Sequence, residues 1–273
     1  MKKFSGMLFC TDLDGTLYAD DKTVSRKNLD AIEYFKSEGG LFTFITGRVP
    51  MTSGEICRTI RPNAPFGCLN GGGIYDYNAQ RFLWNVHLPD DALELVLSVY
   101  HTLPDIGIQF NTERGIYFAR DNDATQGFRD RTGISHITCP CDAPPETLLK
   151  VVFAHYNGDR ILALAHHLNN HPKAQDFDFI RSEHHLYELL PKGVSKGSVL
   201  LKMAALLGIA PAKTIAVGDY DNDVSMLKTA GLSFAVENAS PSAKSAAHHL
   251  TVSNNDHAIA AIIDALDRGL YEL

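Results

Sequence analysis

Two aspartates near the start of the chain, Asp12 and Asp14, have a spacing that suits catalysis or metal binding. They end an apolar run that begins at Met7, and Gly15 and Thr16 follow them, in the order MLFCTDLDGTLY. This pattern predicts a buried strand that stops abruptly at a turn. Alternation along the strand directs both carboxylates to one side, where like charges raise a pKa strongly unless a cation or proton lies between them. The stretch therefore predicts a metal site or an acid–base pair, although a simple strand end capped by Asp14 also fits it.

Composition limits the class of protein. The 273 residues are 45% hydrophobic and 21% charged, which is ordinary for a globular chain able to bury a core. The formal net charge of -7 comes without a block of basic residues, so we expect no nucleic-acid partner. We also expect no membrane partner, because no stretch approaches the roughly 20 apolar residues of a membrane span. The start does not resemble a signal peptide, and the five scattered cysteines suggest reduced thiols, so the expected location is cytoplasmic.

Apolar runs and glycine-rich stops predict an alternating β-α-β pattern at both ends of the chain. Such a pattern favours a parallel sheet with right-handed crossovers. Beyond the first strand, the predicted strands are 41–45, 66–69, 214–217 and 232–236. The predicted helices are 25–38, 51–61, 196–207, 222–229 and 256–268.

Residues 83–189 differ in kind from the rest. They predict hairpins with interleaved helices, at 89–101, 106–110, 116–119, 151–156, 159–170, 177–180 and 186–190, with a polar loop at 121–131. This mixture is typical of an α+β unit. The expected fold class is therefore α/β, with a Rossmann-like parallel-sheet core formed by 1–82 and 190–273 and an inserted α+β domain formed by 83–189.

Four polar clusters stand at the predicted strand ends or helix starts of the core. Because a parallel sheet collects its strand ends on one edge, these clusters can converge. They are Asp12 with Asp14, Thr46 with Gly47 and Arg48, Lys196, and Asp219 with Asn222 and Asp223. Carboxylates without His or Cys suit a hard cation such as Mg2+. Hydroxyl, amide and ammonium donors suit phosphate oxygens, so the set indicates a phosphoryl-transfer site.

Asp12 and Asp14 can divide the work of such a reaction. An ionised Asp12 could attack phosphorus and form an aspartyl phosphate. Asp14 could protonate the leaving alkoxide and then activate the water that hydrolyses the intermediate. Without an acid or base at position 14 the intermediate would persist, so this aspartate favours turnover by hydrolysis.

Together the motifs resemble those of the haloacid dehalogenase superfamily. In order they are DLDGT at 12–16, TGR at 46–48, NGG at 70–72, PKGVSKGSVL at 191–200 and GDYDNDVSML at 218–227. The insert and the KGVSKG approach to Lys196 resemble the Cof-type sugar phosphatases of that superfamily, which carry a type IIB α+β cap. One departure is Asn70-Gly71-Gly72, where the family often has Asn-Gly-Ala, and it puts nothing catalytic in doubt.

The resemblance implies a role for each matching residue. Asp12 would be the nucleophile and Asp14 the general acid/base. Mg2+ would be held by Asp12, the backbone carbonyl of Asp14 and Asp219, with Asp223 supporting them. Phosphate or substrate contacts would come from Thr46, Gly47, Arg48, Asn70, Gly71, Lys196 and Asn222.

The insert would act as a cap that selects the leaving group. Candidate contacts in it are the 121–131 loop and His184 or His185. The expected function is a Mg2+-dependent phosphatase of small phosphorylated metabolites, with sugar phosphates as first candidates. A phosphomutase or phosphotransferase using the same aspartyl phosphate is the alternative, and a non-catalytic sensor of phosphate and Mg2+ is a remote one. Both a monomer and a homodimer fit the sequence.

Overall fold

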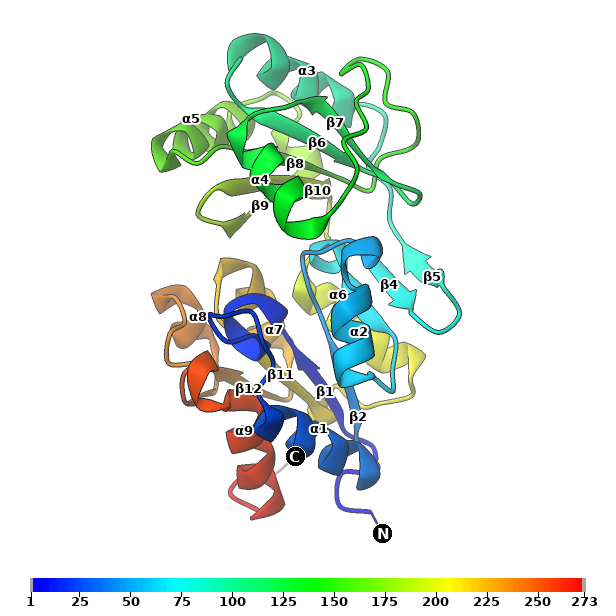
Figure 1. Ribbon diagram of the computed structural model, residues 1–273, viewed down its shortest axis with the longest axis vertical. Helices are drawn as coiled ribbons and strands as arrows, with labels where there is room; N and C mark the ends of the chain where they lie inside the picture. Colours follow the sequence, from blue (N-terminus) through cyan, green and yellow to red (C-terminus); the bar gives the residue numbers. More distant parts are fainter. Residues whose placement is uncertain (1, 272–273) are drawn as a thin grey trace. The chain divides into compact units, whose positions relative to one another are not determined.

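The chain divides into two compact units. The computed structural model describes residues 2–271, and Figure 1 traces them in sequence order. The first unit consists of the described parts of Met1–Trp84 and Ser195–Leu273, and the second unit is Asn85–Val194. The chain thus leaves the first unit once and returns to it.

A parallel sheet forms the centre of the first unit. Its strand order is β13-β12-β11-β1-β2, and every neighbouring pair is parallel (Figure 1). All residues of β1 and β11 are buried, so both faces of the sheet are covered. The strands are β1 (Leu8–Thr11), β2 (Leu41–Phe44), β11 (Thr214–Gly218), β12 (Leu232–Ala235) and β13 (His249–Leu250).

Helices cover this sheet, with α1 packed against α9 and α6 against α7. They are α1 (Arg26–Ser37), α2 (Gly54–Ile60), α6 (Lys196–Leu206), α7 (Val224–Thr229), α8 (Pro241–Ala246) and α9 (Ala258–Asp267). Ser25 caps α1 by accepting a hydrogen bond from the backbone of Asn28, which favours the helix start at that point. The expected single helix at 51–61 is wrong. A 3-10 turn, Pro50–Thr52, comes first, because Ser53 N bonds back to Pro50 O and closes the chain before α2 begins.

A short meander adjoins the parallel sheet. It consists of β3 (Phe66–Cys68), β4 (Gly73–Asp76) and β5 (Arg81–Asn85), with β3 and β4 antiparallel. A parallel bridge between Ile45 and Gly67 links it to the chain after β2. The strand β5 was not expected, and the expected domain limit at 82–83 falls inside it. This strand forms by pairing with β4, and the residues RFLWN alone do not predict such a pairing.

The second unit is built on an antiparallel sheet with the strand order β7-β6-β8-β10-β9. Its hydrophobic core lies between this sheet and two helices, with Leu95 and Val99 of α3 and Leu164 of α5 packed among Phe110 and Phe153 of the sheet. The elements are α3 (Ala92–Thr102), β6 (Gly107–Asn111), β7 (Ile116–Arg120), α4 (Asp123–Thr132), β8 (Lys150–Ala154), α5 (Gly158–Asn169), β9 (Phe177–Glu183) and β10 (Leu186–Pro191).

The helix α4 corrects the expected loop at 121–131. Its sequence, DATQGFRDRT, has no apolar stripe, so periodicity gives no helix signal. A capping box starts the helix instead. The side chain of Asn122 accepts from the backbone of Ala124 and Thr125, and the Thr125 hydroxyl accepts from the backbone of Asn122.

The predicted fold class is confirmed in its architecture: a parallel α/β sheet in the first unit and antiparallel sheets elsewhere. Within residues 2–271, no helix is both long enough and apolar enough to cross a membrane.

Candidate active site

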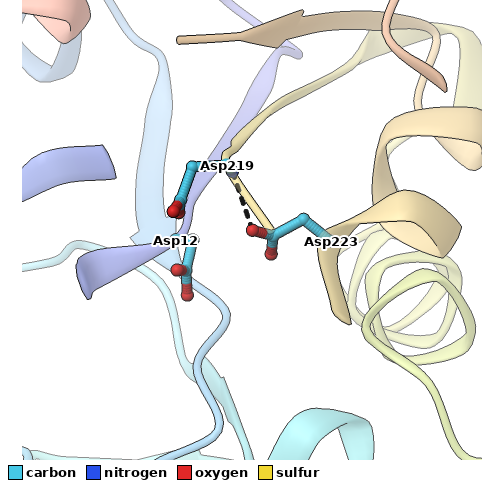
Figure 2. A group of neighbouring side chains, drawn as sticks. All are labelled: Asp12, Asp219 and Asp223. Atoms are coloured by element: carbon cyan, nitrogen blue, oxygen red, sulfur yellow. Dashed lines mark hydrogen bonds between the residues drawn. The ribbon is translucent and has the colours of Figure 1, made fainter. Parts of the chain in front are cut away.

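Three carboxylates converge at one edge of the parallel sheet. Asp12 directly follows β1 and Asp219 directly follows β11, and these two strands are parallel neighbours. Asp223 belongs to the 3-10 turn Asp221–Asp223 that leads into α7. One carboxylate oxygen from each of the three lies within 4.8 Å of the others (Figure 2). The strand register therefore joins residues that are more than two hundred positions apart in the sequence.

The Lys196 ammonium group bridges two of these carboxylates. Its Nζ lies 2.6 Å from Asp12 Oδ1 and 2.6 Å from Asp223 Oδ1, and the lysine side chain is completely buried. Lys196 is the first residue of α6, so the capped start of that helix fixes where its side chain begins. When all groups are ionised, three carboxylates and one ammonium leave an excess of two negative charges, which a divalent cation would neutralise.

Burial and mutual repulsion shift the protonation of this group. Burial, together with Asp223 and Asp219, raises the pKa of Asp12 well above its ordinary value, although Lys196 opposes the shift. Burial and Asp223 raise the pKa of Asp219 to about 7. For Lys196, burial alone would lower the pKa, but Asp12 and Asp223 outweigh it and the pKa is raised. The lysine is therefore fully charged, and the carboxylates need further positive charge to ionise together.

Asp223 also holds the turn that carries Asp219. Its Oδ2 accepts hydrogen bonds from Asp219 N at 2.9 Å and from Tyr220 N at 3.1 Å. Figure 2 draws the first of these as a dashed line. One carboxylate of Asp223 thus binds Lys196 with one oxygen and orders the backbone beside Asp219 with the other.

The glycine and threonine of the DLDGT motif make room for Asp219 and orient it. Thr16 Oγ1 donates to Asp219 Oδ1 at 2.8 Å. Gly15 has a φ of +80°, and a Cβ at this position would lie 2.4 Å from Asp219 Oδ2. A side chain at position 15 would therefore displace the Asp219 carboxylate.

The Asp14 carboxylate lies outside the three-carboxylate group. Arg48 binds it through Nε at 3.0 Å and through Nη2 at 2.8 and 2.9 Å, and Lys22 Nζ lies 3.3 Å from its Oδ1. Burial acts to raise the pKa of Asp14, but Arg48 and Lys22 outweigh burial and lower it. These two cations favour the ionised form of Asp14. The metal role that the resemblance implies for its backbone carbonyl stays a prediction.

Several predicted phosphate ligands form one hydrogen-bonded network. Thr46 is buried; its carbonyl accepts from Asn70 N at 3.1 Å and its hydroxyl accepts from Arg48 N at 3.2 Å. Asn222 Nδ2 donates to Asn70 Oδ1 at 3.1 Å. The Asn70 side-chain amide also lies 3.0 Å from where a Cβ on Gly47 would be, so the TGR and NGG motifs are in direct contact.

Gly71 brings the NGG turn against the start of α6. Its φ is +106°, and a Cβ here would lie 2.1 Å from the carbonyl oxygen of Ser195, the residue before Lys196. Only glycine permits this approach without displacing backbone. The turn therefore supports the helix end from which the Lys196 side chain extends.

Two contacting residues were not singled out by sequence reasoning. Thr16 lies inside the quoted DLDGT motif, so its bond to Asp219 could have been anticipated from its position. Lys22 lies in a polar segment with no motif, and only the structure shows that it reaches Asp14.

Comparison with known proteins matches residues 9–263 to the haloacid dehalogenase-like hydrolase family. The chain belongs to this family. One relative is the 5-amino-6-(5-phospho-D-ribitylamino)uracil phosphatase YwtE of Bacillus subtilis, which is 28% identical over 95% of this chain and 98% of its own length. Another is the pyridoxal phosphate phosphatase YbhA of Escherichia coli, which is 26% identical over 92% of this chain and 95% of its own length.

A solved structure of the same family has this fold. It is a subclass IIB sugar phosphatase of the haloacid dehalogenase superfamily, with a TM-score of 0.83 at 17% identity, covering 97% of this chain and all of that one (100%). The haloacid dehalogenase-like fold therefore extends over both units of the chain.

Proposed function

We propose that this chain is a Mg2+-dependent phosphatase that hydrolyses small phosphorylated metabolites through an aspartyl phosphate on Asp12. The observation that carries the proposal is the 2.6 Å contact between Asp12 and Lys196 inside the three-carboxylate group. It supplies a nucleophile, a fixed positive charge and a cation-binding set of oxygens at one sheet edge. Family membership and relatives named as phosphatases support the same reaction class.

The donor set fits magnesium. All three side chains offer carboxylate oxygens, and their excess negative charge matches a divalent cation. Asp12, Asp219 and the backbone carbonyl of Asp14 would hold the ion, with Asp223 supporting them through the turn beside Asp219. When bound, Mg2+ stabilises negative charge that develops on phosphate oxygens.

The chain's own residues account for the bond changes. An Asp12 carboxylate oxygen attacks phosphorus, the ester P–O bond breaks, and the leaving oxygen takes a proton from the protonated form of Asp14. Arg48 and Lys22 make this the minor form of Asp14 in the protein without substrate. Asp14 then removes a proton from the water that cleaves the acyl phosphate, which restores both carboxyl groups. Lys196, with Thr46 and Asn222, neutralises and orients the phosphate oxygens. Uncatalysed hydrolysis of phosphate monoesters is so slow that these groups must lower the barrier by on the order of 20 kcal/mol.

The second unit would provide substrate specificity. We propose that Asn85–Val194 acts as a cap of the IIB type, with leaving-group contacts drawn from α4, His184 or His185. Sugar phosphates are the first candidates, in keeping with the subclass IIB sugar phosphatase that shares the fold. A cytoplasmic location agrees with this substrate class and with the free thiols of Cys10, Cys57, Cys139 and Cys141.

A substrate panel tests the proposal. Purified protein with Mg2+ should release inorganic phosphate from p-nitrophenyl phosphate and from some members of a set of sugar phosphates, pyridoxal phosphate and the ribitylaminouracil phosphate. Absence of phosphate release from all of them would refute it. A phosphomutase would instead convert a sugar phosphate into its isomer without net phosphate release, so product analysis separates the two.

A further inference from the structure

A turn after the DLDGT motif is tied to a segment near the carboxyl terminus. The turn spans 19–23: Ala19 N donates to Thr23 O at 3.0 Å and Lys22 N donates to Ala19 O at 2.9 Å. Lys22 adopts a φ of +63°, a conformation that non-glycine residues adopt at a cost in free energy. Such a conformation persists where surrounding contacts offset its cost, so the contacts made by the turn must stabilise it.

Asp20 provides those contacts. Its Oδ1 accepts from Asn254 Nδ2 at 3.0 Å and its Oδ2 accepts from Asn255 Nδ2 at 3.0 Å. The backbone N of Asp20 donates to Asn255 Oδ1, also at 3.0 Å. Three hydrogen bonds thus join residues separated by about 235 positions in the chain. The amides of Asn254 and Asn255 lower the pKa of Asp20, so this acceptor is a carboxylate.

The other end of the tie is anchored in the core. Asn254 is buried, and its Nδ2 also donates to Tyr18 O at 3.0 Å. Its backbone N donates to Asn238 Oδ1 at 3.0 Å, and Asn238 Nδ2 donates to Gly15 O at 2.8 Å. Asn238 and Asn254 therefore hold the backbone within the Leu13–Leu17 turn, at Gly15, and directly after it, at Tyr18.

We propose that Asp20, held by Asn254 and Asn255, is a positioning residue that fixes the 19–23 turn so that Lys22 reaches Asp14. This inference rests on the proposed function, in which Asp14 is the general acid/base. Lys22 Nζ lies 3.3 Å from Asp14 Oδ1, and both side chains are partly exposed, at 67% and 36%. An exposed ion pair of this kind contributes little to stability. The effect that we assign to Lys22 is therefore to orient the Asp14 carboxylate.

Neighbouring Asp21 offers a matched control. Among residues 2–271, its Oδ1 accepts from within the turn alone, from Thr23 N at 2.9 Å and Thr23 Oγ1 at 2.7 Å. Asp20→Ala and Asp21→Ala therefore remove the same charge from the same turn, but the first also removes the two side-chain hydrogen bonds to Asn254 and Asn255.

The decisive experiment is a double-mutant cycle on phosphatase activity. Asp20→Ala and Asn255→Ala should each lower kcat about fivefold, with KM changed by less than about twofold. Asp20→Asn, which keeps one acceptor, should recover at least about half of the activity. In a Lys22→Met background, Asp20→Ala should lower kcat by less than about 1.5-fold, because the residue it positions is gone. A kcat loss for Asp20→Ala no larger than that for Asp21→Ala would overturn the proposal, and so would the full loss persisting in the Lys22→Met background.

A second measurement needs no substrate or metal. Hydrogen exchange of the peptide covering 18–24 should speed up by about tenfold in Asp20→Ala, whereas Asp21→Ala should speed up only the Thr23 amide, whose acceptor it removes. Equal exchange rates in the wild type and in Asp20→Ala would contradict the proposal that Asp20 fixes the 19–23 turn. If the wild-type protein released no phosphate from any substrate, the proposed function would fail, while hydrogen exchange would still decide whether Asp20 holds the turn.

Discussion

Lys196 Nζ lies 2.6 Å from Asp12 Oδ1, although the two residues are 184 positions apart in the sequence. The contact joins the end of the first strand to the start of α6, and Asp223 binds the same ammonium group at 2.6 Å. The lysine is therefore both a structural link between elements of the first unit and the fixed positive charge beside the proposed nucleophile.

Removing this charge should destabilise the first unit. Lys196→Met leaves Asp12 and Asp223 as buried carboxylates without their cation, and we expect a loss of about 3–5 kcal/mol in the free energy of unfolding. Urea denaturation measures the loss. Lys228→Met removes an exposed lysine from α7 and should change stability by less than about 0.5 kcal/mol. Equal stability of the two variants would contradict the role given to Lys196.

The close approach of Gly71 to Ser195 should not tolerate a side chain. Gly71→Ala places a Cβ against a backbone carbonyl, so we expect a loss of about 3 kcal/mol or more, and reduced phosphatase activity. Gly208→Ala is the control, because Gly208 also has a positive φ, of +68°, but has no atom within 4 Å of the point that a Cβ would occupy. It should cost only about 1 kcal/mol. Similar losses for the two variants would show that the backbone conformation matters and the contact with Ser195 does not.

His185 should make the second unit sensitive to acid. Burial, with smaller effects from His184 and Arg131, lowers its pKa from 6.5 to about 4. Glu183 Oε2 lies 3.4 Å from its Nδ1, and the Tyr156 ring is 5.5 Å away. A histidine with a lowered pKa favours the folded state fully above pH 6.5, and this contribution is lost as the pH falls from 6.5 toward about 4.

The acid loss can be measured with one substitution and one control. His185→Leu removes the ionisable ring, so its thermal unfolding temperature should fall less than that of the wild type between pH 6.5 and about 4. The corresponding difference in the free energy of unfolding is about 1–2 kcal/mol. His101→Leu changes an exposed position of α3 and should keep the wild-type slope. A slope in His185→Leu as steep as in the wild type would exclude this histidine as the cause.

Magnesium should stabilise the protein through the three-carboxylate group. A ligand at a hundred times its dissociation constant adds about 2.7 kcal/mol to the free energy of unfolding, so Mg2+ should raise the melting temperature and EDTA should reverse the rise. Asp219→Asn should lose most of the shift, whereas Asp264→Asn on α9 should keep it. A shift of full size in Asp219→Asn would place the ion elsewhere.

Much of the site could be predicted because the candidate catalytic residues come directly after predicted strands. Asp12 and Asp219 each come directly after a buried apolar strand, and parallel pairing of β1 with β11 brings them together without further information. The motifs around Thr46 and Asn70 converge for the same reason, as the 3.1 Å bond between Thr46 O and Asn70 N shows.

The features that the sequence did not predict are those without a clear pattern of apolar residues. The strand β5 forms by pairing with β4, and α4 starts at a capping box in a stretch with no apolar stripe. Lys22 reaches Asp14 from the 19–23 turn, which Asp20 joins to Asn254 and Asn255.

The central claim, covalent catalysis by Asp12, is tested most directly by phosphate release from Asp12→Asn in the presence of Mg2+. Asparagine keeps the size of the side chain and removes the nucleophilic carboxylate, so we predict a loss of at least about a thousandfold in kcat. The exposed Asp21→Asn serves as the control and should retain activity. If Asp12→Asn turned over substrate at the wild-type rate, Asp12 would not be the nucleophile and the proposed mechanism would be wrong.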